Sequence, residues 1–164
     1  MISTIIIVIT IAISVYALFN RNVFDILKFN SFLIKHSNQW YRSLSYGLIH
    51  ADWIHLGINM YVFYSFGSIV EYFFDYHFAE KSVFYFILLY VSSVAFSVLP
   101  DIRRHHDNPG YNAVGASGAV SAIVFSSILF YPLGELYILF IPFPIPSFIF
   151  GIIYLIYSAY MSKK

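Results

Sequence analysis

Long apolar stretches are the feature that most limits how this chain can fold. Each is close to the roughly 17–25 residues of a membrane-spanning helix. Only 10% of the 164 residues are charged, whereas a soluble domain carries roughly 25%. We therefore predict an all-α polytopic membrane protein, with residues 1–164 as a single domain in contact with the lipid bilayer. The five predicted spans are residues 2–19, 54–74, 82–99, 115–132 and 136–160.

Composition excludes several other classes of protein. Cysteine is absent, which rules out disulfides and thiolate metal sites. The net charge is +1 and no run of Lys and Arg could neutralise a phosphate backbone, so we expect no nucleic-acid partner. The first apolar stretch has no basic region before it, which favours a retained helix over a cleaved signal peptide. Nothing in the sequence indicates an oligomeric state.

Basic residues gather on one side of the predicted topology. The opposite side carries only Lys81. The positive-inside rule would therefore place the loops after the first and third spans in the cytoplasm. The residues on the basic side are Arg21, Lys28, Lys35, Arg42, Arg103, Arg104, Lys163 and Lys164.

Polar side chains in the second span need an explanation, because they are costly inside a bilayer. His55 and Asn59 are four residues apart and share one helix face. They could bond to neighbouring helices and hold the bundle together. Glu71 lies at the other end of this span, where we expect it to cap a neighbouring segment.

The fourth span begins with Gly115-Ala-Ser117-Gly118. Small residues continue at four-residue spacing through Ala122 and Ser126, which predicts close helix packing. Alone, this short motif is weak support for an enzyme.

The position of Ser117 relative to the second span strengthens the case for catalysis. Both even-numbered spans run in the same direction, so Ser117, His55 and Asn59 are predicted near one membrane face. A helix N-terminus favours negative charge, and side-chain donors from a histidine and an asparagine could complete an oxyanion hole. The serine would still need a base.

In this order the residues resemble the rhomboid family of intramembrane serine proteases. The similarity runs from about residue 40 to residue 132. The set is far more specific than any one motif. Its members are Trp40-x-Arg42, His50, His55, Asn59, Gly67, Glu71 and Gly115-x-Ser117-Gly118.

The resemblance implies a role for each of these residues. Ser117 would be the nucleophile, and His55 and Asn59 would help to hold the oxyanion. His50 would support the cavity and its water. Gly115 and Gly118 would flank the serine, while Arg42 and Glu71 would brace the loop after the first span and the end of the second span.

The resemblance also implies a bundle of six helices with a water-filled cavity that opens away from the cytoplasm. Such enzymes cut single-pass membrane proteins in or beside the transmembrane segment, and they use no cofactor and no metal. The family places the loop after the first span outside, against the charge distribution, and we follow the family. We expect a multi-pass protein of a bacterial inner membrane.

The base is where the sequence departs from the family. Its members carry a histidine near the start of a sixth helix, whereas the last histidine here is His106. We therefore expect this domain to be incomplete at its C-terminus, with the base beyond residue 164, and the 164 residues alone to be inactive. His105 and His106 lie in a polar loop before Ser117, and a solvated loop is the favoured interpretation. At Ser121, some members carry a tyrosine.

Two alternatives remain open at this stage. A rhomboid-like pseudoprotease would bind transmembrane clients without cutting them. A small transporter could form a site at a discontinuous helix, since Pro142, Pro144 and Pro146 could break the fifth span. In that case 136–141 would be a short turn and 147–160 would continue as the helix.

Overall fold

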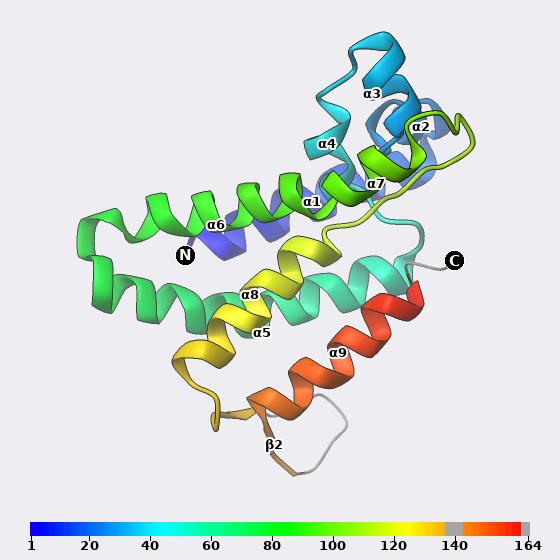
Figure 1. Cartoon of the computed structure of the whole chain (residues 1–164). Helices are drawn as coiled ribbons and strands as arrows, with labels where there is room; N and C mark the ends of the chain where they lie inside the picture. Colours follow the sequence, from blue (N-terminus) through cyan, green and yellow to red (C-terminus); the bar gives the residue numbers. More distant parts are fainter. Residues whose placement is uncertain (137–142, 162–164) are drawn as a thin grey trace.

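A computed structural model describes residues 1–136 and 143–161 of the chain (Figure 1). It is a helical bundle, which confirms the all-α prediction. The main helices are α1 (Ile2–Phe19), α5 (Trp53–Phe78), α6 (Ser82–Ser97), α8 (Ser117–Phe130) and α9 (Ser147–Met161). Shorter helices are α2 (Arg21–Leu27), α3 (Ser31–Ser37), α4 (Arg42–Ser45) and α7 (Leu99–His105), with 3-10 turns η1 (Tyr46–Leu48) and η2 (Ala79–Lys81).

The predicted spans agree with the helices to different degrees. The first three correspond to α1, α5 and α6 within a few residues. By length and composition, the described residues contain two helical stretches that could cross a membrane, Ile2–Phe19 and the continuous Trp53–His105. Ser117–Phe130 and Ser147–Tyr160 are shorter apolar helices. The helix expected over 115–132 is therefore shorter than predicted.

The prediction of one continuous helix over 136–160 is wrong. Strand β1 (Glu135–Leu136) pairs antiparallel with β2 (Ile145–Pro146), and α9 begins only after β2. Proline has no N–H to donate and disfavours helical geometry in the residue before it, so Pro144 and Pro146 delay the helix start. The start at 147 is the one expected if the prolines interrupt the span. Residues 137–142 lie outside the described part.

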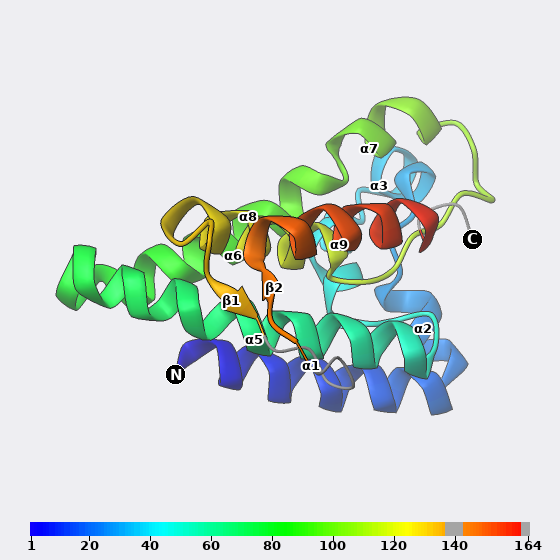
Figure 2. The ribbon, with the colours of Figure 1, turned by 90° about the horizontal axis from the view of Figure 1, so that it is seen from below.

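Helix α5 lies at the centre of the bundle and contacts α1, α6 and α8. Figure 2 shows α1 along one side of α5, with α8 and α9 on the other side. The shared core is rich in aromatic and branched side chains, including Phe63, Phe66, Val120 and Ile123, all at most 1% exposed. Many large apolar residues instead face outward, as expected for surfaces in contact with lipid.

Glu71 joins α5 to the start of α1. Its carboxylate accepts hydrogen bonds from Ser3 N at 3.0 Å and from Ser3 Oγ at 2.7 Å. A negative charge at a helix N-terminus is favourable, and the bond satisfies a backbone N–H that has no partner within the helix. Beside it, Gly67 allows α1 to approach, because a Cβ there would lie 3.0 Å from Ser3 Cβ.

Arg42 organises the segment between α1 and α5. Its side chain is buried, and Nη1 donates to the carbonyl oxygens of Asp25 at 2.8 Å and Lys28 at 2.7 Å. Nε donates to Gln39 Oε1 at 2.6 Å. These charge-assisted bonds hold α2 and α4 together.

The loop that leads into α8 is tied to the same segment. Phe29 and Ala113 exchange backbone hydrogen bonds of 2.9 and 3.2 Å, and Gly115 N donates to Tyr46 O at 3.0 Å. Farther along, the Asn30 side chain donates to Pro109 O at 3.0 Å. The start of α8 is therefore positioned by residues that lie far away in the sequence.

Candidate active site

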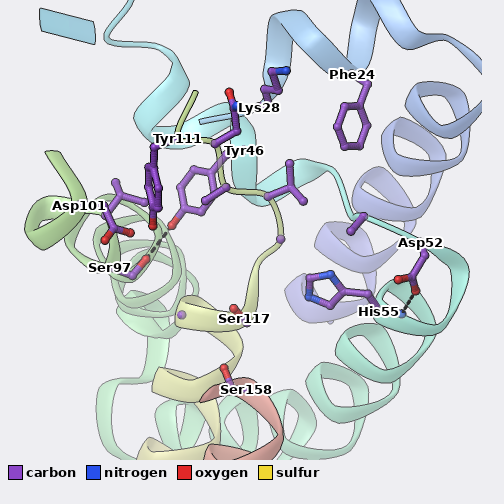
Figure 3. A pocket seen from close by; sticks show the side chains of 17 residues that line it. Phe24, Lys28, Tyr46, Asp52, His55, Ser97, Asp101, Tyr111, Ser117 and Ser158 are labelled. Carbon is purple, nitrogen blue, oxygen red and sulfur yellow. Dashed lines mark hydrogen bonds between the residues drawn. The ribbon is translucent and has the colours of Figure 1, made fainter. Parts of the chain in front are cut away.

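A cavity of about 540 Å³ opens beside the first turn of α8 (Figure 3). Residues from the α1–α5 segment, α5, α6, α7, the loop before α8 and α9 contribute to its walls. Ser117, His55, Gly115 and Gly118, all predicted from the sequence, line it together. The other lining residues are Phe24, Lys28, Tyr46, Ala51, Asp52, Ser97, Val98, Asp101, Tyr111, Asn112, Ala113, Val114 and Ser158.

Ser117 is the first residue of α8. Its hydroxyl has no hydrogen-bond partner within residues 1–136 and 143–161, and its carbonyl oxygen accepts from Ser121 Oγ at 2.7 Å. The first N–H groups of a helix have no partner in the helix itself, and they lie at the positive end of its dipole. The serine is thus next to backbone donors that could hold an oxyanion.

Gly115 has a backbone conformation that only glycine adopts readily, with φ at +109°. A Cβ at this position would lie 2.6 Å from His55 Cε1 and 3.0 Å from His55 Nε2. The absence of a side chain therefore lets the His55 ring lie against the chain two residues before Ser117. Gly118 has a similar role toward α6, since its Cβ would lie 2.5 Å from Ser97 Cβ.

His55 is held by the start of its own helix. Asp52 is the N-cap of α5, and its Oδ1 accepts from His55 N at 2.7 Å. The imidazole is 6% exposed, and its Nδ1 has no partner among the residues that the structure describes. His55 thus lines the cavity wall with a buried Nδ1 that forms no hydrogen bond to the described residues.

Asn59 is placed differently from the sequence-based expectation. It is fully buried one turn below His55 and is not one of the cavity-lining residues. Its Nδ2 donates to His55 O at 2.9 Å, and its Oδ1 accepts from Tyr154 Oη at 3.1 Å. The sequence does not predict this contact with Tyr154, on α9, because a residue pattern does not show how α9 packs against α5.

Replacing Tyr154 with phenylalanine should lower the free energy of unfolding by about 1–2 kcal/mol, because Asn59 Oδ1 would stay buried without its donor. Tyr157→Phe is the matched control, since the Tyr157 hydroxyl has no partner among the described residues. Thermal unfolding in detergent would compare the two variants with the wild type. Equal stability of both variants would contradict a structural hydrogen bond at Tyr154.

His50 lies behind His55 and outside the cavity. It is fully buried, its ring centroid is 5.0 Å from that of His55, and its Nδ1 lies 3.0 Å from Ser14 Oγ. Burial, with a smaller effect of His55, lowers the pKa of His50 to about 3. His50 therefore stays neutral at physiological pH and links α1 to the residues behind the cavity.

The lowered pKa of His50 predicts a pH dependence of stability. Unfolding returns the pKa to about 6.5, so the unfolded chain gains a proton that the folded chain does not bind as the pH falls below that value. The free energy of unfolding should fall by about 2 kcal/mol from pH 7 to pH 5 through this group. Urea unfolding in detergent should show a shallower slope for His50→Gln and an unchanged slope for the exposed His77→Gln. Equal slopes in all three proteins would refute the assignment.

The loop histidines do not line the cavity. The His105 ring stacks on Tyr111 with centroids 3.7 Å apart, and His106 Nδ1 lies 2.8 Å from Arg103 O. His106 Nε2 also lies 3.0 Å from Asp107 Oδ2. The polar stretch predicted as a loop is partly helical, because α7 continues to His105. In the described ranges, His55 is the sole histidine of the cavity wall, and no group of three or more His, Asp or Glu side chains could hold a metal ion.

Comparison with known proteins gives the family. A model of the Rhomboid domain matches residues 37–164, which is more than three quarters of the chain. None of the curated proteins matches the sequence. The match includes Ser117, His55 and the rest of the residue set that carried the resemblance. The chain belongs to the rhomboid family.

Proposed function

We propose that this protein is an intramembrane serine endopeptidase of the bacterial inner membrane that cuts transmembrane segments of single-pass proteins. Ser117 is the nucleophile, and a histidine acts as the base. The observation that carries the proposal is the Ser117 hydroxyl, which has no partner in the described residues and lies at the N-terminus of α8 in a cavity shared with His55.

The reaction follows from these positions. Ser117 Oγ attacks the carbonyl carbon of the scissile peptide bond while the base takes the hydroxyl proton. The negative charge that forms on the carbonyl oxygen is stabilised by N–H groups at the start of α8 and by an N–H of His55. The bond to nitrogen then breaks, and the base returns its proton to the leaving amine. Water then attacks the acyl carbon while the base takes a proton from the water. The bond to Ser117 Oγ breaks, the base returns its proton to Oγ, and the new C-terminal carboxyl group leaves.

Asn59 contributes to this oxyanion site only after a local change. In the structure its Oδ1 is held by Tyr154, and one Nδ2 proton by His55 O. The amide must rotate, or α9 must move, before the free Nδ2 proton can reach the cavity. Entry of a substrate segment beside α9 would supply such a movement. Active sites that are completed by substrate binding are common.

A pseudoprotease is the second candidate. It is supported by one observation: no histidine in the described residues forms a hydrogen bond with Ser117 Oγ. Such a protein would bind transmembrane segments with the same surfaces and release them uncut. The transporter hypothesis gains no support from the family, because the match over residues 37–164 is to the Rhomboid domain.

The test is cleavage by the purified protein, expressed from its complete reading frame and reconstituted in liposomes with a single-span reporter. Mass spectrometry of the products would locate a cut in or beside the apolar segment. A fluorophosphonate probe would report an activated serine in parallel. Failure to cut a panel of reporters, together with no labelling, would overturn the protease proposal in favour of the pseudoprotease.

A further inference from the structure

One end of the cavity carries an acidic side chain that the reaction does not use. Asp101, in the first turn of α7, lines the cavity together with Tyr46, Ser97 and Tyr111. Figure 3 shows these four side chains gathered on one side of Ser117, with His55 and Asp52 on the opposite side. The cavity therefore has a second polar region beside the proposed nucleophile.

The position of this region relative to Ser117 is set by a close contact between helices. Gly118 follows Ser117 directly, and a Cβ on Gly118 would lie 2.6 Å from Ser97 Oγ. Ser97 Oγ in turn lies 2.6 Å from Tyr46 Oη. A side chain adjacent to a peptide bond at Ser117 can thus reach this end of the cavity.

The Asp101 carboxylate has no cationic partner in the described part of the chain. No ion pair forms between it and Arg103 or Arg104, which follow it on α7. Lys28 is the one cationic side chain of the cavity wall, and it pairs with Asp25 at 2.8 Å. Among the described residues, the Asp101 side chain on the cavity wall therefore makes no ion pair.

The two tyrosines beside Asp101 are held in place and stay protonated. The Tyr111 ring stacks on His105, with ring centroids 3.7 Å apart. It also makes an edge-to-face contact with Phe29, with centroids 6.4 Å apart. Burial and the Asp101 carboxylate raise the pKa of Tyr111 to about 12, and burial raises that of Tyr46 to about 12. Their neutral oxygens can accept hydrogen bonds from an ammonium or guanidinium group.

We propose that Tyr46, Ser97, Asp101 and Tyr111 form a subsite for a basic side chain of the substrate, next to the scissile bond. Asp101 is the residue that determines this specificity, because its carboxylate pairs with the Lys or Arg that enters. This inference rests on the proposed protease function, and it adds a preference for a basic residue at the cut.

The experiment compares two single-span reporters that are identical except for Lys or Gln next to the cleavage site. Wild-type protein in liposomes should cut the Lys reporter with about tenfold higher kcat/KM, as expected for a charge-assisted contact of about 1.4 kcal/mol. Asp101→Asn should abolish the preference by lowering kcat/KM for Lys alone. Asp75→Asn, at the far end of α5, is the matched control and should keep the preference.

A binding measurement separates this inference from the protease function. Ser117→Ala protein should bind a fluorescent Lys peptide about tenfold more tightly than its Gln counterpart, and Asp101→Asn in the same background should equalise the two. Such binding without cleavage by the wild type would support the subsite and refute the protease. Cleavage with equal kcat/KM for both reporters, unchanged in Asp101→Asn, would refute the subsite alone.

Discussion

Replacing Ser117 with alanine is expected to reduce the kcat of reporter cleavage by about 10⁴-fold or more, because the covalent step loses its nucleophile. The fluorophosphonate label should disappear in parallel. The stability of the variant should match the wild type, since the Ser117 hydroxyl makes no hydrogen bond with the described residues that the mutation could break.

Ser121→Ala is the matched control for this substitution. Ser121 lies one turn farther along α8, and its hydroxyl donates to the Ser117 carbonyl oxygen at 2.7 Å. It should retain both label and cleavage within a few-fold. Residual cleavage by Ser117→Ala at more than a hundredth of the wild-type rate would assign the nucleophile to another group.

Replacing Gly115 with alanine should lower kcat/KM by about 100-fold, because a small displacement of catalytic groups has effects of this size. The new methyl group would be 2.6 Å from His55 Cε1, so the ring or the loop before Ser117 must move. The φ of +109° adds backbone strain, and the free energy of unfolding should fall by about 1–3 kcal/mol.

Gly57→Ala, in α5, is the control for Gly115→Ala. A Cβ at Gly57 has no atom within 4 Å, and the residue lies inside α5. Alanine there should raise stability by about 0.5–1 kcal/mol and leave cleavage unchanged. Steady-state kinetics and thermal unfolding of both variants would check the pair. Near-normal activity of Gly115→Ala would show that the His55 position is not needed for catalysis.

The sequence predicted the helical fold because apolar length alone identifies helices such as α1 and α5. It placed Ser117 and His55 together because parallel helices bring their first turns to one face. It could not show that Tyr154 holds the Asn59 amide, because no periodicity reveals how α9 packs against α5.

Local geometry explains the remaining differences. The sequence left open whether the prolines interrupt the last span. In the structure Pro146 pairs with Glu135 in a two-stranded sheet, and α9 begins at the next residue. The sequence did not predict that Asp101 and Tyr111 line the cavity, because charged and aromatic residues in a polar stretch are most often solvated. The ring of Tyr111 is held at the cavity wall by stacking on His105 and by its contact with Phe29.

The hydrogen bonds between Phe29 and Ala113 also have a consequence for biosynthesis. The two residues are separated by 84 positions, so this pairing cannot form until most of the chain has left the ribosome. Closing so long a loop costs entropy that local contacts do not repay. The backbone that presents Ser117 is therefore assembled late, and a nascent chain already inserted in the membrane carries its serine without the arrangement that would make it reactive.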